Sequence, residues 1–476
     1  MVMGEMTQEV EVVFIGGGSG GYAGAFRAAD LGFDVMIVDD APRLGGVCLH
    51  RGCIPSKALL HVGQLLYDAR TAGDLGLKFG EPEIDLEKVR GFKDRVVDRL
   101  ADGLMRLAKQ RGVQVVQGRA TFEDSSTLHL EGADLARVKF KYAVIATGSR
   151  AIALPGTSFA PGGRIMSSTG ALELVDVPER FLVVGGGYVG LELGSVYAAL
   201  GSKVTIVEML DRLIAQADPD LARSVIKRVE EASESVLLST KVYKMVETDD
   251  GVEVTFDGDV SPKSQHFDRV LVAVGRRPNS GNLGLENTKV EVDDRGFIEV
   301  DEQRRTSDPR IFAIGDVIGG MMLAHKAMFE GRVVAEVIAG QPAAFDVVAI
   351  PAVVYTDPAL AWAGLTENEA REQGREIKVA RFPWSASGRA LTMDAPEGMT
   401  KIIADPDSGR VLGYGIVGRE AGEMIAEGAL AIEMGALAED IALTIHAHPT
   451  LSETQAEVAE LFLGSTTHLL PPKSRA

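Results

Sequence analysis

Cysteine is nearly absent from this sequence: only Cys48 and Cys53 occur among 476 residues. A tetrahedral zinc site would need further Cys or His ligands in a second cluster, which the sequence does not show, so we expect no metal site. Cysteines about one helical turn apart can bring their sulfur atoms close enough to bridge. We interpret the pair as a redox-active dithiol; the alternatives are two small buried hydrophobic residues or a static disulfide.

Net positive charge and long apolar runs are also lacking. The formal net charge of -19 disfavours nucleic acids and anionic membranes as partners and suits a basic protein partner. No apolar run reaches the roughly 18 residues that a membrane helix needs, and Met1–Glu9 lacks the pattern of a signal peptide. We therefore expect a soluble, cytoplasmic protein, and its length predicts about three domains.

The residues around the cysteines are basic. Lys57, Arg51 and His50 lie close to the pair in sequence, and a helix that begins near Cys48 would direct its amide dipoles toward the sulfur atoms. Both effects favour the thiolate form, which attacks disulfides. Pro55 fits the first turn of such a helix or kinks it.

A dinucleotide-binding unit precedes the cysteines. A predicted strand over residues 9–15 leads directly into Gly16-Gly17-Gly18-Ser19-Gly20-Gly21, which opens a predicted helix over residues 22–31. In this G-x-G-x-x-G setting the glycines allow a tight turn and the close approach of a pyrophosphate to the helix N-terminus. The next predicted strand, residues 34–38, ends at Asp39, where a carboxylate can accept hydrogen bonds from a ribose.

The same unit returns 169 residues later, which indicates two dinucleotide-binding domains of one design. The matching pairs are Gly16 with Gly185, Gly18 with Gly187, Gly21 with Gly190 and Asp39 with Glu208. Glu208 would accept from a free ribose hydroxyl but repel a 2'-phosphate, which favours NAD over NADP in the second unit. The first unit is followed by the dithiol, which exchanges electron pairs with a flavin, so we expect FAD there.

The remaining segments suggest how the domains are completed. Residues 60–111 predict a long amphipathic helix with Leu100, Leu104 and Leu107 on the face that covers the sheet, and Val113–Tyr142 predicts a small antiparallel insert that recurs near Leu237–Phe267. The predicted strand Ile311–Asp316 ends in an acid well placed for a ligand or, alternatively, for capping a helix.

The C-terminal part predicts a third domain of antiparallel sheet and helices. It contains His446-Ala447-His448 followed by Glu453, and a His–Glu pair is a general acid-base device. A zinc-binding His-x-His or a pair of packed histidines is the alternative.

These motifs together resemble the dihydrolipoamide dehydrogenases, a family of class I pyridine nucleotide-disulfide oxidoreductases. The likeness extends from about Val10 to Gly464. It implies an α/β fold with two Rossmann-like dinucleotide-binding domains and a C-terminal α+β dimerisation (interface) domain. The expected boundaries are 1–150 and 279–348 for the FAD domain, 151–278 for the NAD domain and 349–476 for the interface domain.

The resemblance also implies roles for individual residues. Cys53 would face the flavin, Cys48 would exchange with substrate, and His448, paired with Glu453, would act as the base on the disulfide of the other subunit. Lys57, paired with Glu192, would lie by the flavin. The FAD site would comprise Gly16, Gly18, Gly21, Asp39, Lys57, Ala120, Gly148, Asp316 and Ala324, and the NAD site Gly185, Gly187, Gly190, Glu208, Val242 and Gly275.

The activity implied is oxidation of protein-bound dihydrolipoamide by NAD in 2-oxo acid dehydrogenase or glycine cleavage complexes. Expected partners are a second copy of the chain, the lipoyl domain of an acyltransferase or a glycine-cleavage carrier protein, and the basic subunit-binding domain of the acyltransferase core. Alternatives are another flavin disulfide reductase, resembling glutathione reductase, and a mainly structural docking flavoprotein. One departure from the family pattern is His50-Arg51 between the cysteines, and we expect this charge to lower the pKa of Cys48.

Overall fold

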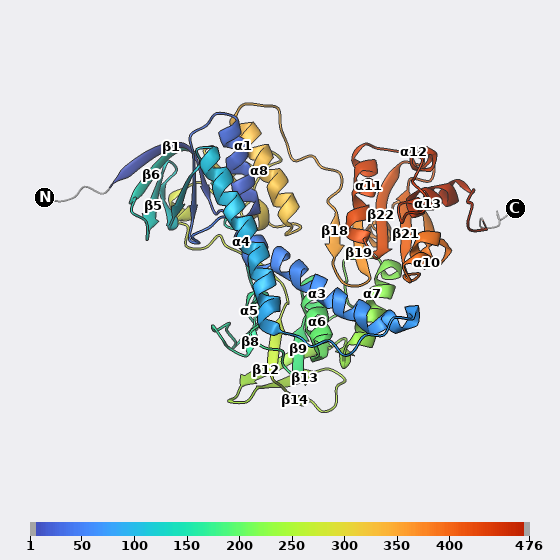
Figure 1. Cartoon of the computed structure of the whole chain (residues 1–476). Coiled ribbons are helices and arrows are strands. Elements are labelled where there is room, and N and C mark those ends of the chain that lie inside the picture. The colour runs from blue at the N-terminus through green and yellow to red at the C-terminus, as the bar shows by residue number, and fades with distance from the viewer. Residues whose placement is uncertain (1–5, 471–476) are drawn as a thin grey trace.

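The computed structural model describes residues 6–470, so Met1–Glu5 of the N-terminal segment considered above lie outside the described residues. Figure 1 shows three lobes, with the first glycine-rich unit, the second unit and the C-terminal part each forming one. None of the helices within the described range is long and apolar enough to cross a membrane.

The first lobe is built on a seven-stranded sheet. Strands β3, β2, β1 and β6 run parallel in that order, β17 joins β6 in parallel, and β5 and β4 continue the sheet antiparallel. The bounds are β1 Thr7–Ile15, β2 Val35–Asp39, β3 Gln114–Gln117, β4 Arg119–Asp124, β5 Thr127–Glu131, β6 Arg137–Ile145 and β17 Ile311–Ala313. The antiparallel insert is therefore smaller than we predicted, because β3 pairs in parallel with β2.

Helices α1 (Ser19–Asp30) and α8 (Ala324–Ile338) lie side by side on one face of this sheet (Figure 1). Glycines allow their close approach, since a Cβ at Gly331 would lie 2.4 Å from the Gly20 carbonyl oxygen. The alanine-rich side of α1 and the valines of α8 are buried against β1 and β2. As a result, the N-terminal ends of both helices meet at the same edge of the sheet.

The segment after Cys48 forms three helices and not one long helix. Gly52 separates α2 (Gly46–Arg51) from α3 (Cys53–Thr71), and α4 (Leu86–Gln110) follows after the short 3-10 turn η1 (Ala72–Leu75). The predicted buried face of α4 was wrong in part. Leu100 and Leu107 are 44% and 40% exposed, because the small side chains on the adjacent face, Ala101 and Ala108, make the close contact.

The second lobe repeats the parallel arrangement. Strands β11, β10, β9, β15 and β8 form one sheet, and β15 lies beside β9 as β6 lies beside β1. The antiparallel sheet β12–β13–β14 is the predicted insert. The bounds are β8 Ile165–Met166, α5 Ser168–Glu173, β9 Arg180–Val184, α6 Tyr188–Leu200, β10 Lys203–Val207, α7 Pro219–Ala232, β11 Ser235–Leu237, β12 Lys241–Glu247, β13 Val252–Asp257, β14 Ser264–Phe267 and β15 Arg269–Val272.

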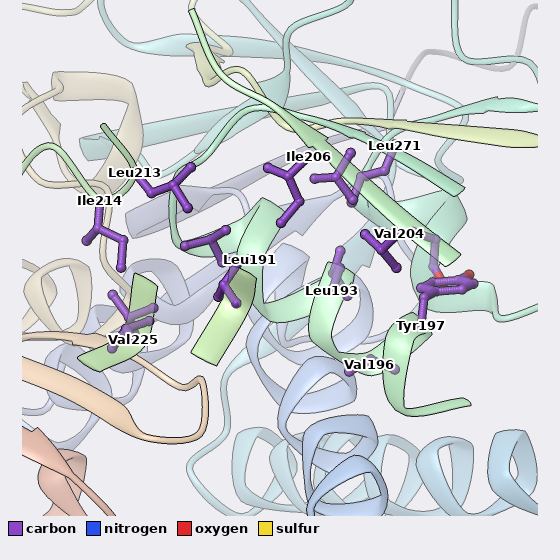
Figure 2. Close-up of a cluster of buried hydrophobic side chains, with 14 of the residues drawn as sticks. Leu191, Leu193, Val196, Tyr197, Val204, Ile206, Leu213, Ile214, Val225 and Leu271 are labelled. Carbon is purple, nitrogen blue, oxygen red and sulfur yellow. The ribbon is translucent and has the colours of Figure 1, made fainter. Parts of the chain in front are cut away.

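The core of the second lobe reaches into its neighbours. Figure 2 shows Leu191, Leu193 and Val196 of α6 packed with Val204 and Ile206 of β10. The same cluster includes Leu59 of α3 and Val354, Leu360 and Val417 of the third lobe. The three lobes are therefore held around one apolar cluster beside α3, which carries Cys53.

The third lobe contains the predicted antiparallel sheet, in the order β18-β19-β22-β21-β20, covered by helices. The bounds are β18 Ala352–Val354, β19 Ala359–Gly364, α9 Glu367–Glu372, β20 Lys378–Pro383, η4 Trp384–Ala386, α10 Gly388–Thr392, β21 Met399–Ala404, β22 Val411–Gly418, α11 Ala421–Glu433, α12 Ala438–Leu443 and α13 Glu453–Leu463. Between the lobes lie β7 Ser149–Ala151, β16 Arg276–Pro278, η2 Leu285–Asn287 and η3 Gly315–Ile318, and β7 pairs with β16.

Candidate active site

The first glycine loop has the geometry that a pyrophosphate needs. Gly16 has φ +107°, and a Cβ at Gly21 would lie 1.9 Å from the Gly16 carbonyl oxygen, so only glycine fits at these positions. Gly18 caps the N-terminus of α1, and its backbone faces Gly46, where a Cβ would lie 2.6 Å from the Gly18 Cα. Helix α2, which carries Cys48, therefore begins directly against the first glycine loop.

Asp39 and Glu208 make the same contacts in the two units. The Asp39 carboxylate accepts hydrogen bonds from the N–H groups of Gly17 and Ala41, at 2.5 and 2.8 Å. The Glu208 carboxylate accepts from Gly186 and Leu210, at 2.6 and 2.8 Å. Each carboxylate has lone pairs left for a ribose hydroxyl.

The second glycine loop leaves room for a ligand. A Cβ at Gly187 would meet no heavy atom within 4 Å, whereas one at Gly190 would lie 2.2 Å from the Gly185 carbonyl oxygen. The loop is therefore tight on its inner side and open at the N-terminus of α6. Gly275, with φ +129°, follows β15 at the same sheet edge, and Val242 lies in the neighbouring β12.

The other residues expected at the FAD site lie on elements that converge on the first loop. Ala120 is buried in β4, next to a turn in which the Gly118 N–H donates to the Asp39 carbonyl oxygen. Gly148, with φ +67°, follows β6, and Ala324 begins α8, whose N-terminus adjoins that of α1. Two helix N-termini and an open glycine turn fit the phosphates and ribityl chain of FAD.

Asp316 is held in place by a polar network. Its carboxylate accepts from the Ser149 hydroxyl at 2.5 Å and lies 3.8 Å from the Arg276 guanidinium. The preceding residue, Gly315, donates its N–H to the fully buried carboxylate of Glu330 at 2.8 Å. Arg276 and Glu330 were missed from sequence, although Arg276 directly follows Gly275, an expected residue of the NAD site.

The two cysteines are both free thiols, and they differ electrostatically. The Cys48 thiol donates a hydrogen bond to Cys53, which lowers the pKa of Cys53 to about 7, and the Lys57 ammonium acts in the same direction. The same hydrogen bond, with burial, raises the pKa of Cys48. Near pH 7 about half of Cys53 is therefore thiolate, beside a protonated Cys48 thiol.

The expectation that Arg51 lowers the pKa of Cys48 stays a prediction. The pKa of Cys48 is raised, and the cation that acts on it is Lys57. Arg51 is exposed at the end of α2, and its charge opposes the burial that raises the pKa of Asp39. His50 also does not face the thiols, because its Nε2 atom lies 2.9 Å from the Leu44 carbonyl oxygen.

Glu192 of the second lobe forms the predicted pair with Lys57 of the first lobe and also contacts Tyr355 of the third lobe. Its Oε2 atom lies 2.8 Å from the Lys57 Nζ atom, and its Oε1 atom accepts from the Tyr355 N–H at 3.0 Å. The Lys57 ammonium also lies 4.2 Å from the centre of the Tyr355 ring. Tyr355 was missed because its backbone and ring reach the site from a loop of the third lobe that carries no motif.

The predicted His448–Glu453 pair is present on the third lobe. The His448 Nδ1 atom lies 2.8 Å from a Glu453 oxygen, and the other Glu453 oxygen accepts from the Thr450 N–H at 2.8 Å. These contacts lower the pKa of Glu453 against the opposing effect of burial, so the carboxylate stays ionised. The His448 side chain is 76% exposed and is not brought to Cys48 within one chain.

Only one acidic cluster in residues 6–470 has metal-like spacing, formed by Asp218, Asp220 and Glu367. The Lys401 ammonium already lies 2.7 to 2.8 Å from all three carboxylates, and Lys401 is 1% exposed. The cluster is therefore an ion network that joins the second and third lobes. A lone lysine in the apolar run Met399–Ala404 was the only sequence signal for it.

Comparisons with known proteins identify related sequences. Residues 10–331 match the model of the family described as pyridine nucleotide-disulphide oxidoreductase, and residues 350–459 match its dimerisation domain. The chain is 50% identical to a dihydrolipoyl dehydrogenase of Haemophilus influenzae over 99% of both chains, and 48% identical to one of Vibrio parahaemolyticus over 98% of both.

Solved structures give the same result. LpdA from Mycobacterium tuberculosis superposes with a TM-score of 0.88 at 25% identity, covering 95% of this chain and 99% of that one. The HOCl-induced flavoprotein disulfide reductase RclA from Escherichia coli superposes with a TM-score of 0.83 at 27% identity, with the same coverage.

Proposed function

The chain belongs to the pyridine nucleotide-disulphide oxidoreductase family, and from this premise we propose that it is a dihydrolipoamide dehydrogenase, which oxidises protein-bound dihydrolipoamide with NAD. It is an NAD-dependent flavoprotein oxidoreductase with the cofactors FAD and NAD. The observation that carries the proposal is the pair of free thiols on α2 and α3, with Lys57 of α3 in an ion pair with Glu192 and the first glycine loop against the start of α2.

The substrate half of the reaction uses the chain's own residues. In the oxidised enzyme Cys48 and Cys53 are joined by a disulfide. His448 accepts a proton from one dihydrolipoamide thiol, and the resulting thiolate attacks the Cys48 sulfur, so that the Cys48–Cys53 bond breaks and Cys53 leaves as a thiolate. The second substrate thiol then displaces Cys48, forming lipoamide. Two electrons and two protons pass to the enzyme, with one proton on Cys48 and one on His448.

The cofactors complete the electron path. FAD, when bound, supplies the carrier that passes this electron pair to NAD. We assign it to the first lobe, at Gly16, Gly18, Gly21, Asp39, Lys57, Ala120, Gly148, Asp316 and Ala324, and NAD to the second, at Gly185, Gly187, Gly190, Glu208, Val242 and Gly275. The corresponding division of the chain is 1–150 with 279–348, 151–278, and 349–476.

The exposed position of His448 supports a homodimer in which it serves the partner's dithiol. Leu443 and Ile445, just before it, are 75% and 97% exposed, and Met434, directly after α11, is 76% exposed. A second copy that covers these apolar side chains would remove them from water. The match of residues 350–459 to a dimerisation domain supports the same arrangement.

The acidic surface suits docking onto a basic subunit-binding domain, and the lipoyl domain of an acyltransferase or a glycine-cleavage carrier would deliver the substrate. We place the enzyme in the cytoplasm, where a free cysteine pair stays available for catalysis. A glutathione reductase-like activity is disfavoured by Glu208, whose carboxylate would repel the 2'-phosphate of NADP. A mainly structural docking role remains the second candidate, because the net charge of -19 favours docking whether or not the dithiol turns over.

Activity assays with the FAD-loaded protein test the proposal. We expect Cys48→Ser to abolish dihydrolipoamide oxidation while it retains NADH oxidation by artificial acceptors, which do not need the dithiol. A purely structural flavoprotein would show no dihydrolipoamide turnover in the parent protein, and turnover that survives in Cys48→Ser would refute the dithiol's role.

A further inference from the structure

The first histidine of His446-Ala447-His448 has no role in the reaction proposed above. Its side chain is 7% exposed, whereas that of His448 is 76% exposed. A buried imidazole next to a catalytic base needs partners for both ring nitrogens, because an unpaired buried polar atom is costly.

Both ring nitrogens of His446 face hydrogen-bond acceptors. The Nδ1 atom lies 2.9 Å from the Thr444 carbonyl oxygen, and the Nε2 atom lies 2.8 Å from Oε1 of Glu427. A carbonyl oxygen can only accept, so Nδ1 carries a hydrogen and donates it. An ionised carboxylate also only accepts, so a proton lies between Nε2 and Glu427. This is a charge-assisted hydrogen bond, and it leaves no ring nitrogen free to bind zinc.

The second oxygen of Glu427 reaches another element. Its Oε2 atom accepts a hydrogen bond from the Gln455 side-chain amide at 2.7 Å, and Gln455 is 1% exposed. Gln455 lies on α13, two residues after Glu453. The one carboxylate of Glu427, on α11, therefore contacts both the loop that carries His448 and the helix that carries Glu453.

We propose that Glu427 is a positioning residue for the His448–Glu453 pair, acting through His446 on one side and Gln455 on the other. The inference rests on the proposed function, in which His448 is the base. Without Glu427 the loop and α13 lose their shared contact to α11, and the His448–Glu453 pair is no longer anchored to that helix. A misplacement of about 1 Å can cost about 100-fold in rate.

Two substitutions separate positioning from a general effect on folding. Glu427→Ala removes both contacts. Glu427→Gln keeps both, because its amide can accept from Gln455 and donate to the Nε2 atom of a neutral His446. Glu423, one turn earlier on α11, is exposed, so Glu423→Ala is the matched control.

The experiment measures dihydrolipoamide oxidation and NADH oxidation by an artificial acceptor in the FAD-loaded enzyme. We expect Glu427→Ala to lose about 100-fold in dihydrolipoamide turnover while it retains NADH oxidation. Glu427→Gln is expected to keep most of the parent turnover, and Glu423→Ala all of it. Parent turnover in Glu427→Ala overturns the proposal, as do equal losses in the Ala and Gln variants or equal losses in both reactions.

A fourth variant distinguishes a failure of the positioning role from a failure of the proposed function. His448→Gln removes the base and leaves Glu427, His446 and Gln455 in place. If His448→Gln retains parent turnover, the proposed function of His448 is wrong. If His448→Gln is slow and Glu427→Ala is as fast as the parent, the base assignment survives and the positioning role fails.

Discussion

Replacing Cys48 with alanine removes the hydrogen-bond donor beside Cys53, whereas replacing it with serine keeps a donor at the same position. The donated bond is the largest cause that lowers the pKa of Cys53 to about 7 from the ordinary value of 9.0. A hydrogen bond to a charged group contributes roughly 1.5–3 kcal/mol, which corresponds to about 1–2 pKa units. Cys53 is exposed, so water replaces part of the lost bond, and about 1 unit is expected for Cys48→Ala.

Loss of the hydrogen bond raises the pKa of Cys53, because the bond stabilises the thiolate. The thiolate predominates above the pKa, so a higher pKa moves the onset of thiolate reactivity to higher pH. Anaerobic alkylation of the reduced protein over a pH series, with Cys53 modification read by mass spectrometry, measures this directly. We expect half-maximal rates near pH 7 for Cys48→Ser and at higher pH for Cys48→Ala. Equal pKa values in the two variants would refute the hydrogen-bond argument.

Three further predictions concern the contacts that hold the site. Lys401→Met leaves Asp218 buried without its partner and should cost about 3–5 kcal/mol in the free energy of unfolding, measured by urea denaturation; an unchanged midpoint would contradict the ion network. Gly46→Ala, at φ +58°, should push α2 away from the first glycine loop and lower FAD content, read from absorbance, in a folded protein; full FAD occupancy would contradict this. The Tyr355 ring holds the Lys57 ammonium, whose charge lowers the pKa of Cys53, so Tyr355→Leu should raise that pKa in the alkylation assay. Tyr355→Phe keeps the ring and should not raise it. Equal values in both variants would exclude a role for the ring.

The features that depend on neighbouring residues in sequence could be predicted. Each glycine loop needs glycine because its own backbone passes too close for a side chain, as at Gly21 and Gly190. The acid that ends the next strand then faces the loop because parallel pairing fixes its register. This is why Asp39 and Glu208, which occupy equivalent positions, make equivalent contacts.

Helix breaks and buried faces were predicted less well. Gly52 has φ -150° and ψ -110°, which end α2 before Cys53 begins α3, but a glycine within a helical pattern does not by itself reveal a break. For α4, Leu100 and Leu107 suggested the buried face, and the observed contact uses Ala101 and Ala108. Close helix packing favours small side chains, which periodicity of large apolar residues does not identify.

Contacts between lobes could not be predicted from local sequence at all. Tyr355 approaches Glu192 from 163 positions away, and Lys401 reaches Asp218 across 183 positions. None of these residues belongs to a recognisable motif of its own segment that would indicate its partner. Their pairing arises only when the shared apolar cluster brings the lobes together, and the Lys57–Glu192 pair was expected only from the family resemblance.

We propose that one chain couples a dithiol to NAD through its bound flavin, with Cys53 as the thiolate beside that flavin. Stepwise anaerobic titration of the FAD-loaded protein with NADH, followed by visible absorbance, tests it most directly. We predict a long-wavelength charge-transfer band that is complete after two electrons and absent in Cys53→Ser. Immediate bleaching of the flavin without that band in the parent protein would contradict the account.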